Sequence, residues 1–174
     1  MNIKNELCTG CCLFDCRGPV ESEFLPDVAP GVLFVGEAPG AVEIEKGRPM
    51  VGQAGQVLRN TLEYLGKTCA PLQHFAIANV FRCRPPGNVL EEDAVPGEYC
   101  KQALLHDLTF DYKVIVPLGS TALTAVCPEM EGVNITAIQG KLFTSNGRFI
   151  LPMFHPSYIN RRGSEWRSWE LGFD

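Results

Sequence analysis

The chain has 174 residues, 45% of them hydrophobic and 20% charged, so it is neither compositionally disordered nor too short to bury a sizeable core. Its formal net charge of −5 disfavours a protein that coats DNA electrostatically, although a local basic groove stays compatible with it. No apolar run approaches the roughly 18 residues of a membrane helix, and no apolar signal-peptide region follows Met1. We therefore expect one domain, residues 1–174, in a reducing cytoplasm and without a membrane partner.

Eight cysteines in a reducing compartment favour metal or cluster ligation over disulfides. Cys8 and Cys11 form a Cys-x-x-Cys pair, whose two intervening residues let both thiolates turn toward one ion or cluster. Cys83 and Cys100 lie far downstream, so the chain lacks the two close pairs of a zinc ribbon. From spacing alone, a redox pair, a zinc site and an iron–sulfur cluster all stay open, as does a buried structural role for Cys83 and Cys100.

A glycine-rich stretch after the first apolar run carries the clearest sign of a ligand site. Residues 32–36 are typical of a buried strand, GEAPG follows at 36–40, and a second glycine-rich segment occupies 47–55. Strand, abrupt glycine turn and glycine-rich loop is the order in which an α/β sheet offers its carboxyl edge to a ligand. Glu37 is therefore expected at the mouth of a pocket. The alternative is a tight turn with a solvated glutamate.

Strands alternate with helices along the rest of the chain. The expected strands are 32–36, 75–81, 114–119 and 149–154, and the expected helices are 56–65, 98–110 and 120–126. Residues 128–147 read as irregular, with Asn146-Gly147 as a turn signal. This alternation predicts a three-layer α/β/α sandwich around a central four-stranded parallel sheet.

Four polar residues fall at or just past the carboxyl ends of the expected strands: Glu37, Asn79, Ser120 and His155. A buried asparagine must find partners, so Asn79 either ties down a loop or reads the edge of a ligand. Ser120 begins a helix, as a cap or a phosphate ligand. His155 stands where sites on such sheets collect. The convergence predicts a pocket without naming its substrate.

Taken in order, these motifs resemble those of the family 4 uracil-DNA glycosylases, the iron–sulfur type, from Cys8 to about Trp169. The resemblance rests on Cys-x-x-Cys-x-Leu at 8–13, GEAPG at 36–40, GRP-x-VG-x-AG at 47–55, Asn-x-x-x-CRPP at 79–86, Cys100, Leu-Gly at 118–119 and His-Pro-Ser at 155–157. Each motif is weak alone, whereas the ordered set at fitting intervals is specific.

The resemblance implies hydrolysis of the N-glycosidic bond of deoxyuridine in single- or double-stranded DNA, which leaves an abasic site for base-excision repair. A base inside a duplex must first be extruded into the enzyme's pocket. The resemblance also implies a monomer with a structural [4Fe–4S] cluster that braces the loops beside the DNA groove. Its four ligands would be Cys8, Cys11, Cys83 and Cys100.

The same resemblance assigns roles to the polar residues. Asn79 would donate to uracil O4 and accept from N3–H, a pattern that rejects cytosine. His155 would donate toward O2 as negative charge grows on the departing base, and Glu37 would place the attacking water or stabilise the sugar cation. The substrate pocket would be lined by Gly36, Ala38, Pro39, Gly40, Met50 and Asn79. The DNA would be contacted by Arg84, Ser120, Ser157 and Arg161.

Two residues depart from the family pattern. Met50 stands where the family usually has an aromatic that stacks on the extruded base, a contact worth about 1–3 kcal/mol in single-strand binders. Ile44 takes the second acidic place after the GEAPG loop, while Glu43 is kept. These departures leave two alternatives open, a glycosylase for a modified pyrimidine and a catalytically weak or silent uracil- or DNA-binding module.

Overall fold

A five-stranded sheet forms the middle layer of this computed structural model, which describes residues 6–24, 31–67 and 74–158. The strand order is β2-β1-β3-β5-β4, and every neighbouring pair is parallel except β4 with β5. The strands are β1 (Val32–Gly36), β2 (Phe75–Asn79), β3 (Val114–Pro117), β4 (Phe143–Ser145) and β5 (Arg148–Ile150).

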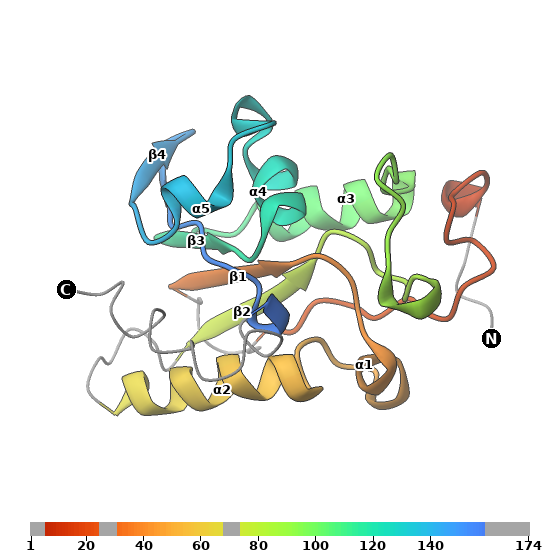
Figure 1. The fold of residues 1–174 in the computed structure, drawn as a ribbon, viewed down its shortest axis with the longest axis horizontal. Helices are drawn as coiled ribbons and strands as arrows, with labels where there is room; N and C mark the ends of the chain where they lie inside the picture. Colours follow the sequence, from red (N-terminus) through yellow and green to blue (C-terminus); the bar gives the residue numbers. More distant parts are fainter. Residues whose placement is uncertain (1–5, 25–30, 68–73, 159–174) are drawn as a thin grey trace.

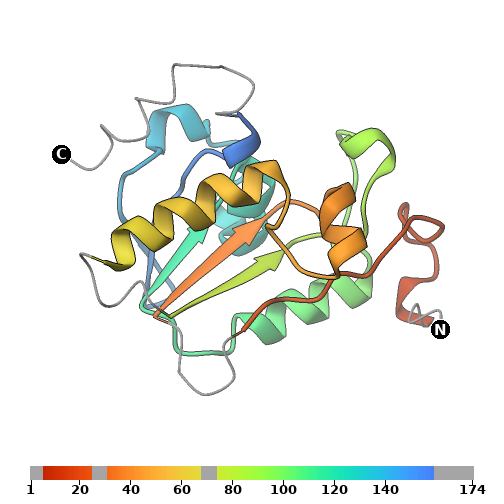
Figure 2. The same cartoon turned by 90° about the horizontal axis from the view of Figure 1, so that it is seen from below.

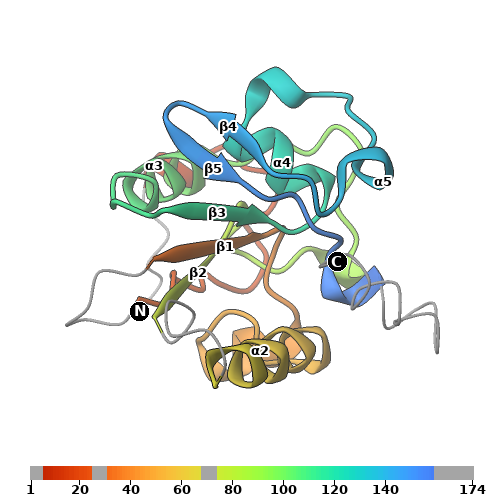
Figure 3. The same ribbon diagram turned by 90° about the vertical axis from the view of Figure 1, so that its left-hand side faces the viewer.

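Helices cover both faces of this sheet. Figure 1 shows α3 and α4 on one side and α1 and α2 on the other, and Figure 2 shows α2 crossing in front of β1, β2 and β3. Figure 3 views the strands from their side, with α2 on the opposite face from α3 and α4. The helices are α1 (Ala41–Lys46), α2 (Gln53–Gly66), α3 (Glu98–Asp107), α4 (Ser120–Val126) and α5 (Ile135–Ile138), with 3₁₀ turns η1 (Glu6–Cys8), η3 (Pro86–Asn88) and η4 (Pro128–Met130). None of the helices in the described ranges is long and apolar enough to span a bilayer.

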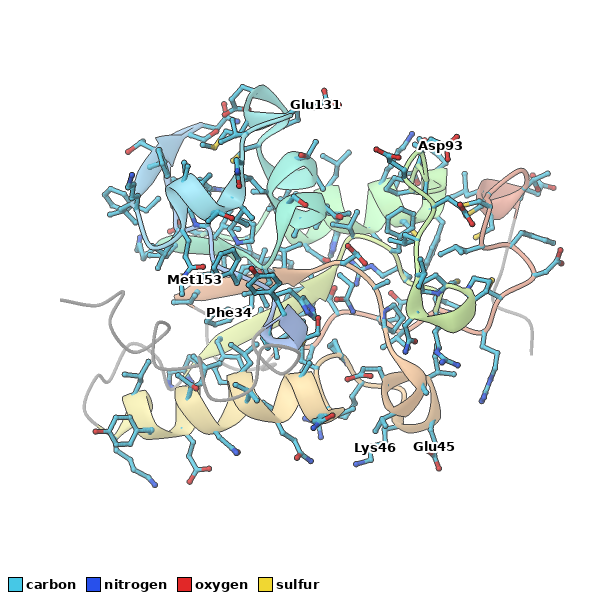
Figure 4. The ribbon with its side chains drawn as sticks, in the orientation of Figure 1. Phe34, Glu45, Lys46, Asp93, Glu131 and Met153 are labelled. Atoms are coloured by element: carbon cyan, nitrogen blue, oxygen red, sulfur yellow. The ribbon has the colours of Figure 1, made fainter. Side chains whose placement is uncertain are left out.

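Side chains of β1 alternate between two hydrophobic cores. Leu33 and Val35 pack with residues of α3 and α4, whereas Val32 and Phe34 pack with residues of α2. Figure 4 shows Phe34 and Met153 near the middle of the molecule, and both belong to the α2 core. Because both faces of the strand are covered, β1 reads as a continuous apolar run rather than as an alternating one.

The predicted α/β sandwich is confirmed, but the predicted count of four strands is wrong. The strand expected at 149–154 is the short β5 followed by a single bridge between Leu118 and Met153. The additional strand, β4, lies within the segment expected to be irregular. Asn146 and Gly147, with φ of 48° and 75°, form the tight turn of a β4–β5 hairpin, as their turn signal predicted. A three-residue strand is too short for its alternation to be detected in the sequence.

A buried ion pair joins the exit of β2 to α3. The guanidinium of Arg82 contacts the carboxylate of Asp107 and the hydroxyl of Ser22, and Ser22 Oγ donates to Asp107 Oδ2 at 2.6 Å. The Arg82 and Asp107 side chains are only 1% and 5% exposed. Removing one partner of such a pair leaves an uncompensated charge in a place that water does not reach.

We expect Asp107→Ala to lower the free energy of unfolding by about 3–5 kcal/mol, because the Arg82 guanidinium loses its counter-ion. The measurement is the thermal unfolding midpoint followed by circular dichroism. The matched control is Asp111→Ala, whose carboxylate pairs with Lys113 on the surface and should matter little. Equal midpoints for the two variants would show that the buried pair does not stabilise the fold.

Candidate active site

The strand register brings the predicted polar residues to one edge of the sheet. Gly36 pairs with Asn79 at the carboxyl ends of β1 and β2. On the other side of β1, Leu118 N–H donates to the Val35 carbonyl at 2.8 Å, and Leu118 bridges to Met153. His155 follows Met153 by two positions. Asn79 and His155 therefore leave the sheet at the same edge, on opposite sides of the β1 terminus.

Gly36 is the point at which three distant segments meet. A Cβ built on this glycine would lie 2.5 Å from Asn79 Oδ1 and 2.6 Å from Met50 Cε. Real Cβ atoms do not approach other atoms this closely, so only glycine leaves room for both side chains. The Asn79 amide oxygen and the Met50 methyl carbon thus share the small space that a Cβ of Gly36 would fill, at the end of β1.

Asn79 is 2% exposed, and its Oδ1 has no hydrogen-bond partner among residues 6–24, 31–67 and 74–158. Leaving a buried carbonyl oxygen unpaired costs about 1–3 kcal/mol. An amide that tied down a loop would have its acceptor satisfied within the protein. Its geometry therefore favours the ligand-reading interpretation of Asn79 over the loop-tying one.

His155 is half-buried and its ring is held by Ser157. The Ser157 N–H donates to His155 Nδ1 at 3.2 Å, and the Ser157 hydroxyl lies 2.8 Å from the same nitrogen. Because Nδ1 accepts a backbone N–H, the neutral imidazole carries its proton on Nε2. Ser157, which the sequence assigned to DNA contact, thus contacts the predicted catalytic imidazole.

Glu37 is also half-buried, and a threonine that the sequence analysis missed orients its side chain. Thr121 Oγ1 donates to Glu37 Oε2 at 2.8 Å, from the first turn of α4. Ser120, the neighbouring residue that we singled out, is exposed. The prediction of Ser120 as a helix cap is wrong, because the cap position is Gly119 and no side chain caps this helix.

A buried acid joins the two glycine-rich loops around the candidate pocket. Glu43 is 9% exposed, and its Oε1 accepts from the Val51 and Gly52 N–H groups at 2.9 and 2.6 Å. Its Oε2 lies 2.7 Å from the position of a Cβ on Gly40. The carboxylate of α1 therefore sits at the amino terminus of α2, where the helix dipole favours negative charge.

The remaining predicted site residues are placed as follows. Pro39 is buried, and the half-buried Ala38 packs against the core on the α3 and α4 side. Arg84 is half-buried, and its Nε donates to Asn88 Oδ1 at 2.7 Å. Arg161 lies outside the described residues.

Four cysteines from three separate segments line one cavity. They are the residues singled out above, Cys8, Cys11, Cys83 and Cys100. No set of three or more His, Cys, Asp or Glu side chains in the described ranges is arranged to hold a metal ion. A single ion needs its ligands drawn tightly together, whereas a polynuclear cluster fills a wider space between its thiolates. Neither Cys12 nor Cys16 lines the shared cavity.

Two of these cysteines accept hydrogen bonds from backbone N–H groups. The N–H groups of Leu13 and Arg82 each donate at 3.4 Å, to the sulfurs of Cys11 and Cys100 respectively. Burial raises the pKa of the Cys100 thiol, the Arg82 N–H lowers it, and the neighbouring Cys11 raises it further. A metal or cluster binds cysteine as the thiolate, so binding at Cys100 would release a proton.

The chain is similar to known proteins of one superfamily. Residues 23–172 match the family model for the uracil DNA glycosylase superfamily. The chain is 37% identical over 137 residues to the type-4 uracil-DNA glycosylase of Thermotoga maritima, across 76% of this chain and 68% of that protein. It is 34% identical over 168 residues to the type-4 uracil-DNA glycosylase of Sulfurisphaera tokodaii, across 89% and 73%. For the Archaeoglobus fulgidus protein of the same name, identity is 32% over 151 residues, across 82% and 73%. The resemblance seen in the motifs is therefore confirmed, and the chain belongs to the uracil-DNA glycosylase superfamily, with type-4 members as its relatives.

Proposed function

We propose that this protein is a uracil-DNA glycosylase, which hydrolyses the N-glycosidic bond of deoxyuridine in DNA and leaves an abasic site. Its superfamily and the names of its relatives support this activity. The single observation that carries the proposal is the Asn79 amide, whose buried Oδ1 has no partner in the described residues and faces Gly36 and Met50.

Recognition of the base rests on the Asn79 amide. Uracil presents an N3–H donor beside the O4 acceptor, so Asn79 Oδ1 accepts from N3–H while its NH₂ group donates to O4. Cytosine reverses both, with a bare N3 and an amino group. A buried amide that finds its partners only in uracil discriminates strongly, because the wrong base leaves its polar atoms unpaired. The base reaches this pocket by extrusion from the DNA stack.

Departure of the base rests on His155. As the glycosidic bond breaks, negative charge develops on the uracil ring and on O2. The Nε2 proton of His155 donates to O2, and Ser157 keeps the ring in the orientation that allows this. Such a hydrogen bond accelerates the reaction because it strengthens as the charge grows.

The sugar side of the reaction rests on Glu37. The hydrogen bond from Thr121 fixes the direction of its carboxylate. A fixed carboxylate beside the pocket either places the attacking water or stabilises the positive charge on the sugar. Backbone groups of Gly36, Ala38, Pro39 and Gly40 complete the floor of the pocket.

The four cysteines that share a cavity are proposed to hold a structural [4Fe–4S] cluster. Cys8 and Cys11 belong to the amino-terminal arm, residues 6–24. Cys83 follows β2, and Cys100 lies in the first turn of α3. When bound, the cluster would supply a rigid cross-link between these segments. The backbone hydrogen bonds to Cys11 and Cys100 support this assignment.

The partner of the enzyme is uracil-containing DNA, single- or double-stranded. Arg84, Ser120, Ser157 and Arg161 are proposed to contact it. We further propose that the protein is a monomer and a single domain, and that it works in the cytoplasm, where a reducing environment preserves its cysteines.

A glycosylase for a modified pyrimidine is the second candidate, and Met50 favours it. An unbranched thioether adapts its shape more readily than an aromatic ring does. A silent binding module is less well supported, because the retained Glu43 accepts both loop hydrogen bonds and Ile44 does not take part in them.

The decisive assay incubates the protein with oligonucleotides containing uracil, 5-substituted uracils or hypoxanthine, then cleaves abasic sites with alkali. We expect scission at uracil, and Asn79→Ala should reduce its rate by 100-fold or more, on the order of other lost transition-state contacts. The variant should not lose stability through a broken Oδ1 hydrogen bond, since Oδ1 has no partner in the described residues. Scission only at 5-substituted uracils would favour the second candidate, and scission at no base would reject both.

His155→Ala should slow single-turnover excision much more than it weakens binding to uracil-containing DNA, because the imidazole acts as charge develops. Ser157→Ala is the graded comparison: it removes the hydroxyl but keeps the N–H bond to Nδ1, so the loss should be smaller. Equal losses of rate and of binding in His155→Ala would assign this histidine to folding or DNA contact instead.

Cys83→Ser should lower the iron content per chain and the visible absorption of the purified protein, since one cavity-lining thiolate is lost. Cys12→Ser serves as the control, because Cys12 lies in the same arm but is exposed and does not line the cavity. Full iron content in Cys83→Ser, or equal loss in Cys12→Ser, would contradict the proposed ligand set.

A further inference from the structure

The guanidinium of Arg59 is hydrogen-bonded to the backbone at Pro49 and Met50. From the second turn of α2, Arg59 Nε donates to the Met50 carbonyl at 2.7 Å, and one terminal nitrogen donates to the Pro49 carbonyl at 2.9 Å. A planar guanidinium presents its donors in a fixed fork, so two successive carbonyls bound to it have a defined orientation.

The backbone that Arg59 holds is in an unfavourable conformation. Met50 has φ of 51°, in the left-handed region that favours glycine. α2 accommodates it by close contact, because a Cβ on Gly55 would lie 2.0 Å from the Met50 carbonyl carbon. In this conformation the Met50 side chain is 6% exposed, and its Cε reaches the space beside Gly36.

Arg59 is itself held by Glu23. Two nitrogens of Arg59 donate to the two carboxylate oxygens of Glu23, at 3.2 and 2.6 Å. Burial raises the pKa of Glu23, but the hydrogen bonds from Arg59 and Arg48 outweigh it and bring that pKa below its usual value. The carboxylate is therefore ionised at neutral pH and stays paired with the guanidinium.

Glu23 is fixed in turn to the strand that carries Asn79. Its N–H donates to the Ile77 carbonyl at 2.8 Å, and the Ile77 N–H donates to the Glu23 carbonyl at 3.0 Å. Ile77 precedes Asn79 by two positions on β2. A chain of hydrogen bonds thus connects β2 to Glu23, Glu23 to Arg59, and Arg59 to the Met50 carbonyl. The Met50 side chain in turn lies beside Gly36, next to Asn79 of the same β2.

We infer that Arg59 is a positioning residue that sets the gap between Met50 and Asn79, and with it the shape of base that the pocket accepts. The identity of that base rests on the proposed function. Arg59 does not touch the base in this scheme; it acts through the backbone of Met50. Glu23 fixes the position of the Arg59 guanidinium relative to Asn79, because Glu23 is hydrogen-bonded to β2, the strand that carries Asn79.

The first test observes Met50 directly and needs no enzymatic activity. The chain has four methionines, so labelling their methyl carbons with ¹³C gives a short spectrum, in which Met50→Leu identifies the Met50 signal. Arg59→Gln should move that signal toward the position of a mobile methionine. Arg48→Gln is the matched control, since Arg48 pairs with the same Glu23 carboxylate but is bonded to neither carbonyl.

An unmoved Met50 signal in Arg59→Gln, or an equal movement in Arg48→Gln, would overturn the inference. If the glutamine variant does not fold, Arg59→Lys gives the same comparison, because lysine keeps the charge without the fork. A smaller movement in the same direction is then expected, and no movement would again overturn the inference.

The second test is a double-mutant cycle on single-turnover excision of uracil. Arg59→Gln should slow excision by up to about 100-fold, the order of the loss when a reacting group is misplaced by about 1 Å. In the Met50→Ala background the same change should have a much smaller effect, because the side chain that Arg59 positions is gone. Independent, multiplying losses would overturn the inference. A wild-type protein without activity on uracil would reject the proposed function alone, and the methyl spectra would still decide the role of Arg59.

Discussion

The pairing of Gly36 with Asn79 is the contact on which the site depends. It places a residue without a side chain opposite a buried amide, at the carboxyl ends of two adjacent parallel strands. The space left by the missing Cβ is shared with Met50, which comes from a different loop. Helices cover both faces of the sheet and keep water away from the Asn79 amide. Its unpaired oxygen therefore gains a full hydrogen bond when a ligand offers an N–H donor.

Much of this edge could be predicted because it depends on local sequence. A fully buried strand appears as an uninterrupted apolar run, and β1 and α4 have the bounds that were expected, 32–36 and 120–126. Parallel strands then bring their carboxyl ends together by topology alone. This rule predicted Glu37, Asn79 and His155 at one edge of the sheet, and the motif resemblance supplied the chemistry that the rule does not contain.

The parts that could not be predicted depend on contacts between distant residues. Arg59 and Glu23 are 36 positions apart, and neither belongs to a sequence motif that marks their pairing. Thr121 was passed over for its neighbour, because only the placement of α4 against Glu37 shows which hydroxyl is in reach. The helix α1 was missed because it has six residues between glycines, too few to show a helical period.

Glu43 and Ile44 are neighbours in α1, but only the Glu43 side chain connects two loops. The carboxylate of Glu43 reaches the amino terminus of α2 and lies against Gly40. One side chain therefore fixes the loop before α1 relative to the loop after it. The Ile44 side chain takes no part in these hydrogen bonds and is only partly buried. Replacement of a second acid at position 44 thus leaves that joint intact. A substitution at position 44 therefore alters one partly buried side chain, whereas a substitution at position 43 would leave the Val51 and Gly52 N–H groups without their acceptor.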